Sequence, residues 1–255
     1  MHIDELLEAA SADFFWLPPH VQTVEREAIH YSYSPRGDTN YNRVVRLRPD
    51  LEPPQALVEE IRRFHGDGES LWLLNSFSDT PMMRRALLDG GYREGQRHLA
   101  CAIASDRFPP QISGDSSVRE VRTSQELALL YRIWEEVFGS PPNLSEEDFQ
   151  RELQACTAPD RRVVRFLATR KGRVAGTAAM TLFPHLDFAL IWAGAVLKEH
   201  RRQGVYTALL AARAHLAASR GITAIGLYAR EDTSAPIVLA KGFECGGHMV
   251  YFQRP

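Results

Sequence analysis

The sequence has few cysteines, and none of them stands in a paired or metal-binding pattern. Cys101, Cys156 and Cys245 are widely spaced and form no CxxC motif. An odd, scattered set neither completes a disulfide framework nor provides the ligand spacing of a zinc site. We therefore expect buried or free thiols in a reducing cytoplasm, and no bound metal.

Long apolar runs and an excess of charge of one sign are also missing. No stretch approaches the roughly 20 apolar residues of a membrane-spanning helix. Thirty Lys and Arg against 32 Asp and Glu give a formal net charge of −2, so no global field attracts nucleic acid or an anionic membrane. The opening MHIDELLEAASADFFW lacks the basic start and apolar centre of a secretory signal. These absences predict a soluble cytoplasmic protein without nucleic-acid or membrane partners.

A composition break divides the chain. The stretch DRFPPQISGDSS, residues 106–117, combines prolines, glycine and serines, and is typical of a linker. It predicts one domain over residues 1–108 and another over 117–255, both of ordinary domain size.

The second part alternates strand and helix patterns, which predicts an α+β fold with a mixed sheet. Lys171–Gly172 is a hairpin turn signal, and Thr123 or Ser124 is a candidate cap for the first helix. The expected elements are a strand at 118–122, helices at 125–138 and 145–156, a hairpin at 162–183, a strand at 188–197, a helix at 204–219, a strand at 222–229, a helix at 234–241 and a strand at 248–253.

The two parts of the chain end in similar patterns. Residues 72–104 and 226–252 each give a strand, Asp-Thr, a short helix, a glycine followed by an aromatic residue, and a strand. Such self-similarity favours a duplicated domain. Chance recurrence of a common strand–helix–strand unit is the alternative.

The stretch KEHRRQGVYTALL, residues 198–210, carries the main functional signal. A strand that runs through a glycine turn into a helix leaves unpaired amides at the helix mouth, and these can bind phosphate oxygens. Gly204 allows close approach to the backbone, and Arg201 or Arg202 adds positive charge. The pattern is neither GxxxxGK[ST] nor GxGxxG, so a solvated turn or a nucleic-acid contact stays an alternative.

In this element order the stretch resembles the GNAT superfamily of acyl-CoA-dependent N-acyltransferases. The family signature V-x-x-x-x-[RQ]-x-x-G-x-[GA] is matched by Val196, Arg201 and Gly204, whereas Tyr206 departs from its small residue. The resemblance covers about residues 118–253. It implies the GNAT fold, with a second, degenerate GNAT-like domain in the first part of the chain.

The resemblance also implies how acetyl-CoA, the co-substrate, is held. The pantetheine would pair with the edge of the strand at 188–197, and a backbone amide near Val196 or Leu197 would bind the oxyanion. The residues expected to bind CoA are Gly194, Ala195, Val196, Arg201, Arg202, Gln203, Gly204, Val205, Tyr206 and Thr207.

The sequence does not identify which residues act as general acid and general base. The family tyrosine that protonates the departing thiolate corresponds to Val238, and a frequent family asparagine corresponds to Glu231. Neither role transfers to this chain. The candidates for acid or base are therefore open: Glu231, Tyr228, Asp187, Tyr251, His185 and His248.

The first part of the chain lacks an equivalent of the glycine turn. PDLEPP, residues 49–54, stands at the corresponding place. Its prolines lack N–H groups and its acids repel phosphate, so we expect one CoA per chain, bound in the second part.

These patterns lead to a predicted function. The chain is expected to be a GNAT N-acetyltransferase that acts on a primary amine of a small molecule or peptide, as a monomer or homodimer. A non-catalytic acyl-CoA-binding or sensor module is the alternative.

Overall fold

The structure is a computed structural model, and it describes residues 2–108, 115–139 and 145–254. The chain forms two compact units. The first comprises residues 1–102 and 228–255, and the second comprises residues 103–227. Half of the linker expected at 106–117, residues 109–114, lies outside the described residues.

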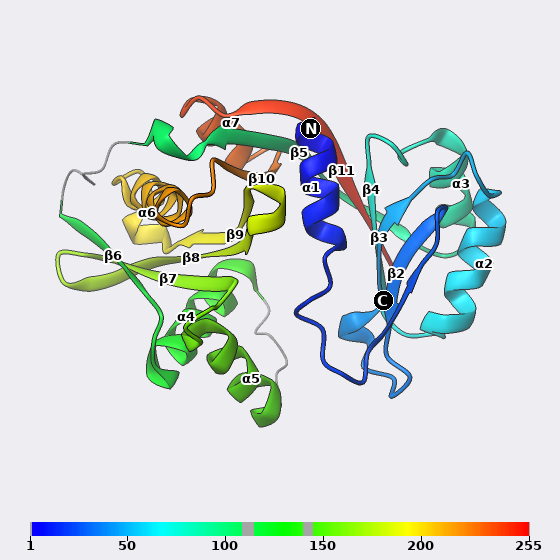
Figure 1. The fold of residues 1–255 in the computed structure, drawn as a ribbon, viewed down its shortest axis with the longest axis horizontal. Helices are drawn as coiled ribbons and strands as arrows, with labels where there is room; N and C mark the ends of the chain where they lie inside the picture. The colour runs from blue at the N-terminus through cyan, green and yellow to red at the C-terminus, as the bar shows by residue number, and fades with distance from the viewer. Residues whose placement is uncertain (1, 109–114, 140–144, 255) are drawn as a thin grey trace. The chain divides into compact units, whose positions relative to one another are not determined.

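The first unit is a six-stranded sheet with the strand order β1-β2-β3-β4-β11-β5. Among the strand pairs of this unit that the structure describes, only β3 and β4 are parallel. Helices α2 and α3 lie on one face of this sheet and α1 on the other (Figure 1). The elements are α1 (Ile3–Ala12), β1 (Gln22–Glu25), β2 (Ile29–Tyr33), η1 (Thr39–Tyr41), β3 (Arg43–Leu47), α2 (Pro54–His65), β4 (Ser70–Asn75), α3 (Pro81–Asp89), β5 (Arg93–Ala104), α7 (Ser234–Leu239) and β11 (Glu244–Arg254).

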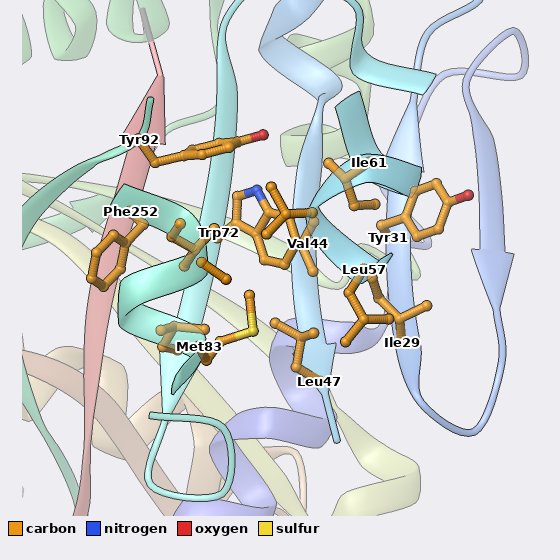
Figure 2. Close-up of a cluster of buried hydrophobic side chains, with 14 of the residues drawn as sticks. Ile29, Tyr31, Val44, Leu47, Leu57, Ile61, Trp72, Met83, Tyr92 and Phe252 are labelled. Carbon is orange, nitrogen blue, oxygen red and sulfur yellow. The ribbon is translucent and has the colours of Figure 1, made fainter. Parts of the chain in front are cut away.

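The core of the first unit is formed between its sheet and helices α2 and α3. Leu57 of α2 and Met83 of α3 pack against Val44 and Trp72 of the sheet (Figure 2). Phe252, from the far end of the sequence, completes the same cluster and is fully buried. The first unit therefore depends on β11 for its core.

The observed units and the predicted domains differ in where they place β11. β11 pairs antiparallel with both β4 and β5, and so belongs to the sheet of the first unit. The domain prediction, 1–108 and 117–255, rested on the composition break at 106–117, and the contacts between residues do not test it. It stays a prediction.

The expectation of free thiols at all three cysteines is wrong. Cys101 of β5 and Cys245 of β11 stand directly opposite each other and form a disulfide. Their sequence separation of 144 residues conceals this pairing, which only the strand register produces. Cys156 is a buried free thiol, as expected. The cysteines no longer argue for a reducing compartment.

The second unit is a sheet with the strand order β10-β9-β8-β7-β6. Helix α6 lies on one side of β7–β9, and α4 and α5 lie on the other (Figure 1). The elements are η2 (Ser105–Arg107), β6 (Ser116–Glu120), α4 (Ser124–Phe138), α5 (Glu146–Thr157), β7 (Val163–Arg170), β8 (Arg173–Phe183), η3 (Pro184–Leu186), β9 (Phe188–Val196), η4 (Lys198–His200), α6 (Val205–Ser219) and β10 (Ala224–Arg230), which begins in this unit.

The local signals in the second unit are confirmed. The Thr123 side chain caps α4 by accepting a hydrogen bond from the Glu126 amide. The Glu126 side chain accepts one from the Thr123 amide, which completes a capping box. Lys171 and Gly172 have φ values of 50° and 76°, the left-handed conformations that a tight hairpin turn requires. The fold class, a mixed α+β sheet, is confirmed as well. No helix in the described part of the chain is long and apolar enough to cross a membrane.

Candidate CoA-binding site

The backbone turns sharply between β9 and α6. Arg202 and Gly204 have φ values of 60° and 82°. An L residue other than glycine in this region costs roughly 1–2 kcal/mol, so the turn favours glycine at position 204, whereas Arg202 adopts this conformation at that cost. A Cβ placed on Gly204 would meet no atom within 4 Å. The glycine therefore faces open space at the helix mouth.

The first turn of α6 presents free amides to that space. Gly204 occupies the N-cap position, and no side chain caps the helix there. Within the described residues, the first helical amide with a carbonyl acceptor is that of Ala208, which bonds Gly204 O at 2.9 Å. Unpaired N–H groups and the helix dipole together attract phosphate oxygens. Of the expected CoA residues, Val205, Tyr206 and Thr207 lie in this turn, and Arg202, Gln203 and Gly204 lead into it.

Two side chains hold the turn in shape. Arg201 Nε donates to the carbonyl of Val196 at 3.1 Å, and Gln203 Nε2 donates to the carbonyl of Glu199 at 2.7 Å. Arg201 and Arg202 are otherwise exposed. Arg201 therefore fixes the end of β9 to the loop and still contributes positive charge at the helix mouth.

Strand β9 is bulged immediately before this turn. Ala193 has a φ of 47°, and the register against β8 shifts between Thr177 and Ala179. A non-glycine residue in this conformation is strained, and bulges are frequent next to active sites. The bulge lies directly before Gly194, Ala195 and Val196, the strand residues expected to bind CoA.

Beyond Leu190 the edge of β9 is open within the second unit. β9 pairs with β10 only through residues 188–190. On its other edge, the Leu197 amide donates to the Ala175 carbonyl of β8 at 3.0 Å. Because successive amides in a strand point to opposite edges, the Val196 amide points to the open edge. Of the two expected oxyanion donors, the geometry favours Val196, because the Leu197 amide is already engaged.

Tyr206 and Arg213 of α6 face the bulge together. A Cβ placed on Gly194 would lie 2.9 Å from Tyr206 Cε2 and 3.8 Å from Arg213 Nη2, so the tyrosine ring takes the space that a side chain at 194 would need. Gly194 therefore permits the large residue that departs from the family signature.

Arg213 is a buried cation without a carboxylate partner in the described part of the chain. It is 1% exposed, its Nε donates to the Leu209 carbonyl, and its Nη2 has no acceptor among the described residues. Burial lowers the pKa of Arg213 to about 10, and the neighbouring Tyr206 hydroxyl acts in the opposite direction. The guanidinium thus stays charged at neutral pH beside a phenol.

The opposite face of β9 is aromatic. The rings of Trp192 and Trp134 lie 5.9 Å apart, and the guanidinium of Arg165 stands over Trp192 at 5.5 Å. Arg165 is buried and pairs with Glu152. This face offers flat apolar surface next to the bulge, with its charges already paired.

Asp187 is placed at the far end of β9 from the turn. Its carboxylate accepts from the amide and hydroxyl of Thr223, and these bonds lower its pKa. It occupies a left-handed turn position before the strand. At roughly 3.3 Å per strand residue, it lies on the order of 20 Å from Gly194. The structure does not bring Asp187 to the bulge.

Tyr228 and Glu231 belong to the first unit. Burial raises the pKa of Tyr228 above its usual range, and the nearby Asp4 carboxylate adds to the shift. Glu231 is exposed, and its amide donates to the Arg97 carbonyl. Val238, at the family tyrosine position, is completely buried.

The remaining candidates are also accounted for. His248, in the first unit, contacts Asp79 Oδ2 at 2.7 Å through Nε2 and Ser76 Oγ at 3.2 Å through Nδ1. Tyr251 packs edge-on against His98 with the ring centroids 5.1 Å apart. His185 lies in the exposed turn before β9. No group of His, Cys, Asp and Glu suited to a metal ion occurs among the described residues.

Sequence reasoning missed the pairing of Tyr206 with Arg213. Seven residues apart in a helix, the two share one face. An arginine within an otherwise apolar helical stretch was the available signal. The aromatic pair Trp134 and Trp192 carried no such signal, because only the sheet brings α4 and β9 together.

Comparison with known proteins agrees with this geometry. Residues 127–239 match the acetyltransferase (GNAT) family. A GCN5-related N-acetyltransferase from Kribbella flavida has a similar structure, with 19% identity and a TM-score of 0.72, over 100% of this chain and 96% of that one. No match is found among curated proteins.

Two further solved structures resemble the whole chain. A functionally unknown conserved protein from Staphylococcus epidermidis is 12% identical with a TM-score of 0.69, over 95% of this chain and 98% of that one. A tandem GNAT protein from the clavulanic acid biosynthesis pathway is 14% identical with a TM-score of 0.57, over 99% of this chain and 87% of that one. At such identities the likeness establishes the fold. The matched segment, residues 127–239, is thus similar to the acetyltransferase (GNAT) family, and the chain as a whole has the fold of these solved structures.

Proposed function

We propose that the protein transfers an acetyl group from acetyl-CoA to a primary amine of a small molecule or peptide. One observation carries the proposal: the free amides at the mouth of α6 stand beside the bulged, open edge of β9. The amides of residues 202–207 would hold the diphosphate, and Gly194, Ala195 and Val196 would pair with the pantetheine. A cytoplasmic location, where acyl-CoA is available, goes with this proposal.

The transfer proceeds by direct attack. The neutral amine adds to the thioester carbon, and the resulting oxyanion accepts a hydrogen bond from the Val196 amide. Collapse of the intermediate breaks the C–S bond and completes the amide. The departing thiolate then needs a proton.

Tyr206 is proposed as the donor of that proton. Its ring lies over Gly194 at the bulge, and its hydroxyl adjoins Arg213. Proton transfer forms the S–H bond of CoA and leaves a phenolate, whose charge the guanidinium stabilises. The phenolate regains a proton through solvent, because the nitrogen of the tetrahedral intermediate releases one proton as the neutral amide forms. The buried Arg213 guanidinium would thus have a negatively charged neighbour, the Tyr206 phenolate, only during the reaction.

Tyr228 stays an alternative proposal for the group that protonates the thiolate, and Glu231 stays a proposal for the general base that takes a proton from the amine. Asp187 is less suited, because its carboxylate is engaged by Thr223. Substitution of each by its uncharged or non-ionising counterpart (Tyr228→Phe, Glu231→Gln) tests the two proposals by the loss of turnover with CoA affinity kept.

Binding stoichiometry and thiol release test the function as a whole. Calorimetric titration of the full chain with acetyl-CoA should give one site per chain. Free CoA thiol should then accumulate in the presence of a suitable amine from a panel of small amines and peptides. Two sites per chain, or a bound CoA against residues 49–55, would overturn both the site and the division of labour between the halves.

A non-catalytic acyl-CoA-binding module is the second candidate. Val238, buried and apolar at the family tyrosine position, favours it. Saturable acetyl-CoA binding with no amine-dependent thiol release across the panel would support the module over the enzyme.

A further inference from the structure

The first unit contains a hollow at the ends of its two parallel strands. The cavity has a volume of about 430 Å³. Its walls come from the segment after β3 and the segment after β4, the strands that pair in parallel. The lining residues are Arg48, Pro49, Asp50, Pro54, Phe77, Thr80 and Met82. Small-molecule sites commonly have this size, and open sheets bind ligands at the carboxyl ends of parallel strands.

This hollow is unsuited to a phosphate group. Helix α2 begins with Pro53 as its N-cap and Pro54 as its first residue, so two amides are missing at its mouth. Asp50 adds negative charge to the rim. The one cation in the lining, Arg48, is already bound by the carboxylate of Glu8, with one contact of 2.8 Å.

Its walls are instead apolar and exposed. Phe77 is 40% exposed and Met82 65% exposed, and Leu51 next to the rim is 47% exposed. The Arg48 guanidinium stands 5.2 Å from the centre of the Phe77 ring and holds one face of that ring in place. Burial of such surface by a ligand is favourable, at about 25 cal/mol per Å² of apolar area.

The net charge of the residues around the hollow determines which charged group of a ligand it would favour. Arg48 and Glu8 neutralise each other, and Asp50, which also faces Arg48, leaves the lining with a net negative charge. An ammonium group near Asp50 would be stabilised, and a carboxylate would be repelled. Glu52, on the same segment, is already paired with Arg26.

We propose that this hollow binds a small molecule with an apolar body and a protonated amine. The apolar body lies between Phe77 and Met82, and the ammonium group lies at Asp50. The inference concerns a second site and does not depend on acetyl transfer in the second unit.

Three probes of equal chain length test the proposal on the full-length protein. Octylamine, octanol and octanoate are titrated calorimetrically below their aggregation concentrations. Octylamine should bind at one site about 10-fold more tightly than octanol, because the Asp50 carboxylate attracts its ammonium group. Octanoate should bind more weakly than octanol, because Asp50 repels its carboxylate.

Variants connect that preference to named residues. Asp50→Asn should bring octylamine affinity down to that of octanol, and Phe77→Ala should weaken both probes about 10-fold. Phe64→Ala is the matched control, because Phe64 is 43% exposed in the same unit and does not line the hollow. Urea unfolding of each variant verifies that the unit remains folded.

Several results would overturn the proposal. Equal affinity for the three probes, or tighter binding of octanoate, would remove the role of Asp50. Unchanged binding in a folded Phe77→Ala variant would place the probes elsewhere. Displacement of octylamine by acetyl-CoA at this site would make the hollow a CoA site instead.

Discussion

Two strand–turn–helix corners of the molecule occupy corresponding positions and differ in chemistry. The corner between β9 and α6 has Gly204 at a φ of 82°, exposed arginines and free helix amides. The corner between β3 and α2 has Pro53, Pro54 and Asp50. One topology therefore gives a helix mouth with free amides and exposed cations in one place and an apolar, slightly acidic hollow in the other.

The difference shows that the backbone path alone does not define a phosphate site. Both helices begin next to a strand end, and both have dipoles directed at the corner. Prolines remove the donors at α2, whereas glycine exposes them at α6. A few residues in the turn decide which ligand class the corner can accept.

The largest effect is expected from a charge placed at the glycine corner. Gly204→Asp should weaken acetyl-CoA binding about 1,000-fold, because a carboxylate about 4 Å from a phosphate costs roughly 4 kcal/mol near a protein surface. Gly204→Asn is the control, since asparagine tolerates the same positive φ without the charge. Calorimetry on both variants checks the difference.

The asparagine variant separates the effect of charge from that of backbone strain. At a φ of 82° any side chain at position 204 adds strain, whatever its charge. Equal acetyl-CoA affinity for folded Gly204→Asp and Gly204→Asn would show that no phosphate lies at this corner.

The next largest effect is expected from Tyr206, whose ring lies next to Gly194 at the bulge of β9. Tyr206→Phe should lower kcat about 100-fold, the lower range for loss of a general acid, while acetyl-CoA affinity changes less than about twofold. A thioester with a more acidic thiol should recover much of the rate, because its thiolate leaves without a proton. An equal loss of rate for both thioesters would make Tyr206 a packing residue only.

The buried basic groups of the two helices should differ in their response to acid. His65 of α2 is buried between Ser70 and Ser32, and burial lowers its pKa from 6.5 to about 4. Between these values the unfolded chain binds a proton that the folded chain does not, so stability falls as pH falls from 6.5 toward 4. Arg213 of α6 stays charged in this range and contributes no such slope.

Chemical unfolding at two pH values measures this difference. His65 alone should lower the free energy of unfolding by about 2 kcal/mol at pH 5 relative to pH 7, at 1.36 kcal/mol per pH unit below 6.5. His65→Gln should remove that part of the slope. The same pH dependence in both proteins would show that His65 is protonated in the folded state.

The smallest effect is expected at the opposite end of β9 from the glycine corner. Asp187→Asn should change kcat and acetyl-CoA affinity by less than about twofold, because its carboxylate bonds Thr223 instead of facing the bulge. Steady-state kinetics check this. A loss of turnover above about 10-fold would return Asp187 to the list of proton-transfer groups.

Much of the fold was predictable because its signals are local. Gly91 and Gly242 have φ values of 84° and 89°, and the aromatic residues that follow them are both buried. In each case the aromatic amide bonds a helix carbonyl five residues back, Tyr92 to Leu87 at 3.0 Å and Phe243 to Val238 at 3.2 Å. The repeated strand–helix–strand pattern thus corresponds to repeated local structure.

The features that could not be predicted depend on contacts between distant segments. The Cys101–Cys245 bond requires the register of β5 against β11. The contact of Tyr206 with Gly194 requires the bulge in β9, which no sequence pattern specifies. Turn chemistry near Gly204 was visible in sequence, whereas the proton-transfer groups depend on such distant contacts.

The place of β11 has a consequence for how the protein is made. Val250 and Phe252 complete the core around Trp72, yet they are synthesised long after β4. During translation the nascent first unit lacks one inner strand, and both β4 and β5 present unpaired edges that can associate with other chains. We expect residues 1–108 expressed alone to aggregate, and the ribosome-bound chain to acquire protease resistance in this unit only after residue 254 has left the exit tunnel.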